Sequence, residues 1–465
     1  MNQLAVRPSP PTAAVSLATK ISWGIGSLGT ISYINTVTAL VLVYLTTVVK
    51  LEPLLAGALV TGARIFDAVT DPVMGWISDR TRSRWGRRRP YLLLGALICG
   101  LALPLMYNIP LEESESMRVA WVVAALLFYS IGFTVFNVPY LTMPLEMTAD
   151  NQERLSIMSS RVAFMTLGTF VGSSLAPLVL QWFGRDARGF SLMGMVFGAF
   201  VFAVMTTAFV GTARARTRTA EVQHRPFREQ WRSAIENRPF LILMGVKVLQ
   251  FIGIAAHSST LAYFVTTVMK RDFKFMAVYG VIVGTSTIVS LLLWRPLARH
   301  ISKRSGFMIG VVGYILITLS WLLSGAGESM VVFLLRPILM GVFGSAVLLF
   351  GQVVWIDAVD YDYRRTGLRR EGMFTSVYVF VERLGYSIAP LLLGALLQWM
   401  GFNKNLPLES QSSSAQTAVI ISLVAIPVVT FTLSLALLTR YDLSDEKLAA
   451  TRQFNNPTDA LREAQ

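Results

Sequence analysis

Twelve long apolar stretches run through this chain, and they constrain its fold more than any other feature. Each is about as long as the 20 residues that a helix needs to cross a bilayer. Because lipid offers the backbone no hydrogen bonds, such a chain must satisfy its N–H and C=O groups within helices. We therefore predict an all-α integral membrane protein whose helices cover roughly residues 21–49, 53–78, 90–110, 118–145, 157–183, 188–212, 239–268, 274–299, 306–324, 330–356, 373–399 and 415–440.

The composition excludes a large soluble protein of this length. Of the 465 residues, 54% are hydrophobic and only 15% are charged, whereas soluble domains carry about 25% charged residues. These charged side chains are too few to cover two soluble domains. The single cysteine, Cys99, excludes an internal disulfide and a cysteine-based zinc site.

Motifs of ATP-driven pumps and of enzymes are missing from the sequence. It has no P-loop and no nucleophile motif accompanied by a base. A lipid-modifying enzyme would need a catalytic cluster, and a membrane sensor would need a sizeable soluble domain, but no loop exceeds about 30 residues. We predict a transporter that is not an enzyme and uses no cofactor.

The positive charge of the chain alternates between successive loops. Its net charge is +14, and the arginines and lysines gather in every second connection, at 80–89, 214–238, 299–304 and 364–370. The positive-inside rule places these loops, and with them both termini, in the cytoplasm. Because the arginines are spread over many short turns, a nucleic-acid partner is not expected. We predict a multi-pass protein of the cell inner membrane, in contact with lipid and monomeric.

The longest internal connection divides the twelve predicted helices into six and six. This division predicts a tail at 1–20, a first bundle at 21–212, a linker at 213–238, a second bundle at 239–440 and a tail at 441–465. Two six-helix halves joined by a cytoplasmic linker are the major facilitator architecture. In that fold the substrate binds near the middle of the membrane, between the halves.

Two carboxylates lie one turn apart inside the second predicted helix. Asp67 and Asp71 are four residues apart and share one helix face, with Arg64 one turn earlier. Charges in the bilayer cost several kcal/mol, so this pair needs a proton, a small cation or an arginine. Proton or Na⁺ binding would couple transport to an ion gradient, and Thr70 adds an oxygen ligand. The alternative is a structural ion pair between Asp67 and Arg64.

Polar residues in the fourth and fifth predicted helices form a second candidate group. Thr134 and Asn137 are three residues apart and present a hydroxyl and an amide on one face. They bind a ligand or form an ordinary interhelical hydrogen bond. Arg161 lies about one turn inside the fifth predicted helix, where it contacts a ligand or extends to the interface.

The eleventh predicted helix contains an adjacent acid and base, Glu382 and Arg383. Neighbouring residues on a helix point about 100° apart, so at least one of the two must reach another helix. Arg383 is a plausible partner for Asp67 or Asp71 across the two halves.

The seventh predicted helix carries Lys247 and His257. Lys247 lies near the inner end, and we expect it to extend to the membrane interface. His257 is a proton site, a substrate contact or, more commonly, a hydrogen-bonded interior histidine. The three histidines are far apart in the sequence and show no metal-ligand spacing.

The segment 64–89, RIFDAVTDPVMGWISDRTRSRWGRRR, closely resembles the second span and following loop of the glycoside–pentoside–hexuronide:cation symporters. Further resemblance lies in the order of the segments 23–29, 137–140 and 357–361. This resemblance implies alternating-access symport driven by Na⁺, Li⁺ or H⁺. The two acids that bind the cation in the family match Asp67 and Asp71, which would also be the ligands of a bound Na⁺.

The resemblance also implies roles for other residues. Thr70 stands where the family has an asparagine of the cation site, and Thr134 matches a threonine of that site. Arg161 matches an arginine near the sugar, and Arg383 replaces a lysine close to both sites.

The galactoside-binding part of the family pattern is mostly absent here. The two acids that grip sugar hydroxyls are replaced by Ile31 and Asn137, and a flanking tyrosine by Phe133. This loss makes the predicted pocket more apolar, as in the sodium-dependent lysophosphatidylcholine symporters, which the chain resembles distantly. The substrate is therefore predicted to be a small glycoside or, alternatively, an amphiphile such as a lysophospholipid.

The predicted function is cation-coupled symport, with uncoupled facilitation as the nearest alternative within transport. The predicted cation site is Asp67, Asp71, Thr70 and Thr134, and the predicted substrate site is Ile31, Phe133, Asn137, Tyr140, Arg161 and Arg383. Four further residues are predicted to couple or gate the two halves: Arg64, Asp79, Arg80 and Glu382. Asp79 and Arg80 would do so with neighbouring arginines, in a cytoplasmic charge cluster between helices.

Overall fold

A computed structural model describes residues 15–148, 151–213, 215, 237–366, 371–443 and 447–448. The predicted tails, 1–20 and 441–465, and the predicted linker, 213–238, lie largely outside the described residues. The arginines of the 364–370 loop lie partly outside them. The described residues form helices and connecting turns, without strands.

The first half of the chain contributes seven α-helices, two of which are joined into one span by a π-helical segment, η1. Their bounds are α1 (Leu17–Thr47), α2 (Pro53–Arg80), α3 (Arg89–Met106), α4 (Glu115–Met147), α5 (Asn151–Phe170), η1 (Val171–Leu175), α6 (Ala176–Phe183) and α7 (Ala187–Gly211).

The second half contains six more spans, and here too some spans combine an α-helix with a short π-helical or 3-10 segment. Their elements are α9 (Arg238–Tyr263), η2 (Phe264–Val268), α10 (Phe273–Leu297), α11 (Lys303–Ser320), η3 (Trp321–Leu323), α12 (Met330–Thr366), α13 (Glu371–Trp399), η4 (Leu408–Ser410), α14 (Ser413–Ile420), η5 (Ile421–Ala425) and α15 (Ile426–Leu438).

Twelve of these helical segments are long and apolar enough to cross a membrane, which confirms the twelve predicted spans. Several begin earlier than the hydropathy predicts, because a polar turn continues the helix beyond its apolar part. α5 begins at Asn151 rather than near residue 157. Arg161 therefore lies ten residues inside its helix and not one turn from the end.

The outer surface of the helices is apolar where a soluble protein would be polar. On α3, the residues Leu94, Leu97, Leu101 and Leu105 form one stripe, and each is at least 40% exposed. Exposed apolar stripes of this kind are stable only against another apolar phase. The protein is accordingly a multi-pass membrane protein.

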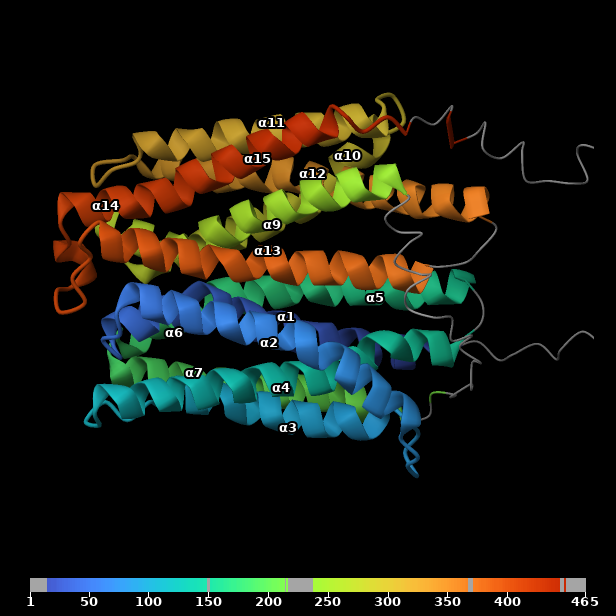
Figure 1. Cartoon of the computed structure of the whole chain (residues 1–465), viewed down its shortest axis with the longest axis horizontal. Helices are drawn as coiled ribbons and strands as arrows, with labels where there is room; N and C mark the ends of the chain where they lie inside the picture. The colour runs from blue at the N-terminus through green and yellow to red at the C-terminus, as the bar shows by residue number, and fades with distance from the viewer. Residues whose placement is uncertain are drawn as a thin grey trace, which may run out of the picture.

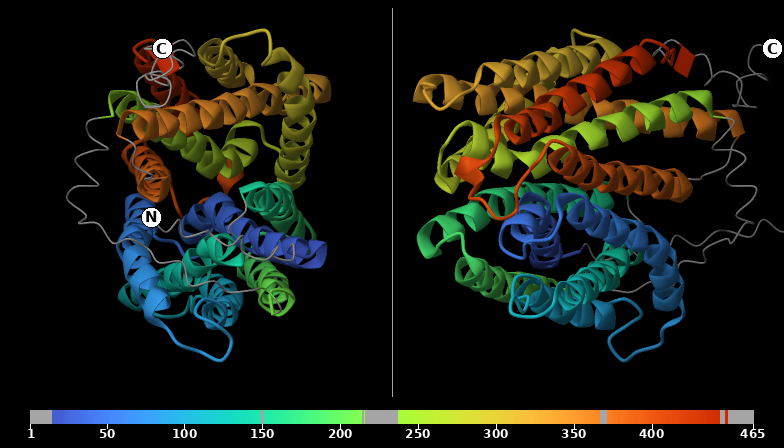
Figure 2. Two further views of the ribbon diagram at one scale, coloured as in Figure 1. Left: turned by 90° about the vertical axis from the view of Figure 1, so that its right-hand side faces the viewer. Right: turned by 60° about the vertical axis from the view of Figure 1, so that its left-hand side comes forward.

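The helices form two bodies that lie side by side. α1 to α7 make up one body and α9 to α15 the other, as Figure 1 shows. Both views of Figure 2 also separate the two groups of helices. We name the end at which α2 stops and α3 starts the arginine-rich end, and the end with the 48–52 and 324–329 turns the distal end.

At the distal end the two bodies meet through α2 and α13. Gly57 of α2 faces the backbone carbonyl of Pro390, and Gly394 of α13 faces the carbonyl of Pro53. A Cβ atom at either glycine would collide with that backbone. The two contacts are reciprocal, because each helix presents a proline carbonyl and, four residues later, a glycine.

Polar contacts between the bodies also lie at the distal end. Thr46 and Tyr263 join α1 to α9 with 2.7 Å between their hydroxyl oxygens. Arg185, in the turn before α7, pairs with Asp272 at 2.8 Å and with Glu409 at 3.0 Å. We call this set of contacts, together with the two glycine contacts, the distal interface.

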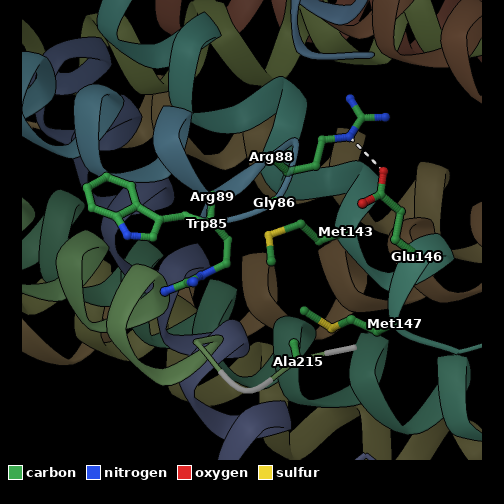
Figure 3. Close-up of a pocket in the computed structure, with 8 residues that line it drawn as sticks. All are labelled: Trp85, Gly86, Arg88, Arg89, Met143, Glu146, Met147 and Ala215. Atoms are coloured by element: carbon green, nitrogen blue, oxygen red, sulfur yellow. Dashed lines mark hydrogen bonds and ion pairs between the residues drawn. The ribbon is translucent and has the colours of Figure 1, made fainter. Parts of the chain in front are cut away.

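At the arginine-rich end, charged residues join helices within one body. Arg88 pairs with Glu146 at 3.0 Å and also with Asp79. Arg87 pairs with Glu146 at 2.9 Å. Figure 3 shows Arg88 and Glu146 beside a small pocket that Trp85, Met143 and neighbouring residues line. All of these residues belong to the first body.

We expect Gly57→Ala to open the distal interface more than Arg185→Ala. An added methyl group overlaps backbone, which cannot rotate away, whereas the Arg185 ion pairs are partly exposed and such pairs contribute about 0–1 kcal/mol. Distances between spin labels in the 107–114 and 324–329 loops measure the open population. Unchanged distances in Gly57→Ala would show that this contact does not hold the bodies together.

Candidate functional site

The centre of the site is an ion pair between the two bodies. Arg383 of α13 reaches Asp71 of α2, with 2.6 Å between Nη2 and Oδ2. Thr134 of α4 donates its hydroxyl to the other oxygen, Oδ1, at 2.8 Å. The Asp71 and Arg383 side chains keep 18% and 14% of their surface exposed, so neither is completely buried.

Asp67 lies one turn from Asp71 and is much less satisfied. It is 2% exposed, and its Oδ1 has no hydrogen-bond partner among the described residues. Arg64 interacts with it electrostatically, but in the described part of the chain the two do not form an ion pair within 4.0 Å. Arg64 instead donates to the hydroxyl of Thr38 at 3.1 Å and lies 5.8 Å from the ring centre of Tyr129.

Two threonines place hydroxyl oxygens beside these acids. The Thr70 hydroxyl donates to the carbonyl of Phe66 at 3.0 Å and lies 3.4 Å from the Thr134 hydroxyl. Carboxylate and hydroxyl oxygens are the ligands that hard cations prefer. The set therefore offers oxygen ligands to a hard cation. Among the described residues, no group of three or more His, Cys, Asp and Glu side chains is placed to hold a metal ion.

A second ionic group lies next to this one. Glu382 of α13 interacts electrostatically with Arg161 of α5, with Lys247 of α9 and with its neighbour Arg383. None of these three forms an ion pair within 4.0 Å with Glu382 among the described residues. Lys247 is only 4% exposed, and its ammonium lies 5.2 Å from the ring centre of Phe307. The expectation that Lys247 extends to the membrane interface is therefore wrong.

The other predicted substrate residues occupy different surroundings. Phe133 lies below the Arg383 guanidinium, 5.6 Å from it, and Asn137 is half-buried one turn further along α4. Ile31 of α1 packs close to Gly168 of α5. The structure thus brings Phe133 to the ion pair, whereas the contact given for Ile31 is with α5.

Tyr140 lies elsewhere, inside the packing of the first body. It is fully buried, and its hydroxyl lies 2.7 Å both from the Ser27 hydroxyl and from the carbonyl of Trp23, to which it donates. Its ring stacks on Trp23 at 4.7 Å. The structure thus does not bring Tyr140 to the ion pair, although it interacts electrostatically with Arg161.

The predicted gating residues near the arginine-rich end also remain within one body. Asp79 pairs with Arg88, and the Arg80 guanidinium lies 3.9 Å from the ring centre of Trp76 on the same helix. Only the first of these contacts joins α2 to the start of α3. The charge cluster is present, but its described ion pairs connect helices of the first body only.

Sequence reasoning missed one buried polar residue of the second body, Gln250. Gln250 is 1% exposed and neither of its side-chain polar atoms has a partner among the described residues. The sequence did contain a signal for Gln250. This residue follows Lys247 by three positions, so the two side chains share a helix face. His257, in contrast, is the interior histidine that was expected, with Nε2 2.9 Å from the Tyr279 hydroxyl.

Fold and site together define a class of protein: a twelve-helix secondary transporter with its charged residues between two six-helix bodies. Residues 22–445 match the family model described as MFS/sugar transport protein. The chain belongs to this family. It is a symporter of the major facilitator type and not an enzyme.

Relatives extend over most of the chain. The putative glycoside/cation symporter YagG of Escherichia coli (strain K12) is 27% identical, and the match covers 94% of each chain. The isoprimeverose transporter of Lactiplantibacillus pentosus is 26% identical, over 91% of this chain and 88% of its own. The sodium-dependent lysophosphatidylcholine symporter 1-A of Danio rerio is 22% identical, over 89% of this chain and 82% of its own.

A solved structure shows the same fold. The crystal structure of a bacterial homolog of the human lysosomal transporter Spinster, inward-facing and unoccupied, aligns with a TM-score of 0.65. The alignment covers 95% of this chain and 98% of that one at 14% sequence identity. Symporter relatives imply a small-molecule substrate and a coupling cation for the chain.

Proposed function

We propose that this protein carries a small glycoside across the cell inner membrane together with Na⁺ or H⁺. Asp67 and Asp71 would bind the coupling cation, assisted by the hydroxyls of Thr70 and Thr134. The substrate would bind between residues 21–212 and 239–440, near Ile31, Phe133, Asn137, Arg161 and Arg383. We infer that the protein functions as a monomer.

One observation carries the cation assignment: the buried oxygen of Asp67 that lacks a partner. An ionised carboxylate in the membrane is costly unless a positive charge compensates it. The nearest arginines are directed to other groups, Arg64 to Thr38 and Arg383 to Asp71. A cation or proton at Asp67 would supply the missing partner. An acid with a purely structural role is expected to have an ion-pair partner, and Asp67 has none within 4.0 Å among the described residues.

The Asp71–Arg383 pair offers a physical route to coupling. It joins a helix of the first body to a helix of the second. A cation that binds both aspartates competes with the guanidinium for Asp71 and weakens this connection between the bodies. Because binding and conformation are linked, the cation shifts the population toward the state that binds substrate, and the substrate favours cation binding equally.

The orientation of the chain follows from its charge. The arginine-rich end would face the cytoplasm, with both termini. The distal interface would then close the outer side, and the site would be open toward the cytoplasm. Asp79, Arg80 and their neighbours would anchor this end, while Arg64 and Glu382 would act at the middle of the membrane.

An amphiphile is the second candidate substrate. The lysophosphatidylcholine symporter among the relatives favours it, as does the apolar ring of Phe133 beside the ion pair. Thermal unfolding of the purified protein with glycosides or lysolipids, each with and without Na⁺, separates the two classes, because a ligand stabilises the state that binds it.

Transport into proteoliposomes tests the coupling itself. We expect a Na⁺ or H⁺ gradient to drive accumulation of the substrate against its own gradient, and counterflow to proceed without one. An uncoupled facilitator would show counterflow at the same rate but would never exceed equilibrium under any ion gradient.

A further inference from the structure

We propose that the second body contains a hydroxyl-binding subsite for the sugar part of a glycoside. It is formed by Lys247, Gln250 and Glu382, with Arg161 opposite them on the first body. This inference rests on the proposed function and names the chemistry by which the same site would recognise its substrate.

Gln250 is the first observation behind this assignment. It is buried on α9, and both its amide nitrogen and its amide oxygen lack partners among the described residues. A buried amide left in this state destabilises the protein, so its presence calls for a ligand. A sugar hydroxyl both donates and accepts hydrogen bonds, and an amide offers the complementary pair.

Glu382 is the second observation. Its carboxylate interacts with three cations, Arg161, Lys247 and Arg383, but none approaches within 4.0 Å among the described residues. These charges do not form direct ion pairs, and the Arg161 Nε atom has no hydrogen-bond partner among the described residues. A polar group of the ligand would bridge them. A hydroxyl there would donate to Glu382 and accept from Arg161 or Lys247, and both hydrogen bonds would be charge-assisted.

Aromatic rings supply the apolar part of such a subsite. Tyr378, one turn before Glu382, lies 5.8 Å from the ring of Trp355 and 5.9 Å from that of Phe251. The Trp355 ring nitrogen is buried without a partner among the described residues. Aromatic side chains with a few unpaired donors are typical of binding sites for small polar molecules.

The two bodies thereby contribute opposite chemistry. Beside the ion pair the first body presents the ring of Phe133. The second body supplies the carboxylate instead, through Glu382. The sugar would face the second body, and an apolar aglycone would lie toward Phe133.

Binding measurements on the full-length purified protein test this arrangement in the presence of Na⁺. The probes are 4-nitrophenyl glucoside and xyloside, a 4-nitrophenyl alkyl ether without sugar, and palmitoyl lysophosphatidylcholine. We expect Glu382→Gln to weaken binding of at least one glycoside about 10- to 100-fold. The matched control Glu113→Gln, in an exposed turn, leaves its affinity unchanged.

Gln250→Leu separates binding from folding. Removing an unpaired amide raises the thermal unfolding midpoint of the free protein while it weakens glycoside binding; a structural role would lower the midpoint. The subsite proposal is refuted if both Glu382→Gln and Gln250→Leu bind glycosides with wild-type affinity. It is also refuted if the wild-type protein binds only the lysolipid. Ion-driven accumulation in the same preparation is a separate readout, because it tests the coupling site and not this one.

Discussion

Asp71→Asn abolishes accumulation of substrate against its gradient while exchange across the membrane continues. The amide cannot carry the negative charge that holds the coupling cation, so the ion gradient is no longer linked to substrate movement. Exchange needs no net movement of the cation and therefore survives. Uptake and counterflow of the same labelled substrate in proteoliposomes measure the two activities.

The replacement also leaves Arg383 without its partner, which can reduce stability independently of coupling. Asp67→Asn provides a second variant, because the Asp67 carboxylate has no direct ion pair in the described part of the chain. It is expected to lose accumulation without this effect on Arg383. Asp442→Asn, at an exposed ion pair, is the matched control and keeps accumulation. Uphill transport by Asp67→Asn and Asp71→Asn would refute the cation site.

Glu146→Ala is expected to produce the largest loss of stability, about 3 kcal/mol. Glu146 is 5% exposed and compensates Arg88, which is 8% exposed, as well as Arg87. Its removal leaves a buried guanidinium that only Asp79 partly compensates. Denaturant or thermal unfolding of the detergent-solubilised protein measures the change.

The comparison for that variant is Asp442→Ala, which breaks an ion pair of 2.8 Å between largely exposed side chains. Solvent screens such a pair, and its loss costs about 0–1 kcal/mol. Equal stability losses in Glu146→Ala and Asp442→Ala would show that the cluster in Figure 3 is not buried in the folded protein.

Hydropathy alone predicted the twelve spans, because an apolar run of sufficient length has no other stable place than lipid. The ends of the helices were less predictable. Polar turns continue α5 back to Asn151, and local hydropathy contains no signal for such an extension. This shift decides whether Arg161 lies at an interface or faces the middle of the protein.

Sequence spacing identified the two acids of α2, since residues four apart share a helix face whatever surrounds them. Which partner each acid takes depends on the other body. Arg383 could have reached either acid, and in the structure it pairs with Asp71. Lys247 was misplaced for the same reason: the partners of a lysine depend on the packing of α9, α11 and α13, which spacing on one helix cannot reveal.

The reciprocal proline and glycine contacts of α2 and α13 have a consequence for the speed of opening. At these two contacts a glycine faces main-chain atoms of the other helix, so no side chain there has to change its rotamer when the helices separate. We expect the helices to return to the same register when they meet again, because each glycine accepts only the close approach of the opposing backbone. We therefore expect these two contacts to add little to the activation barrier for opening. A low barrier suits a transporter that must alternate between its two states many times.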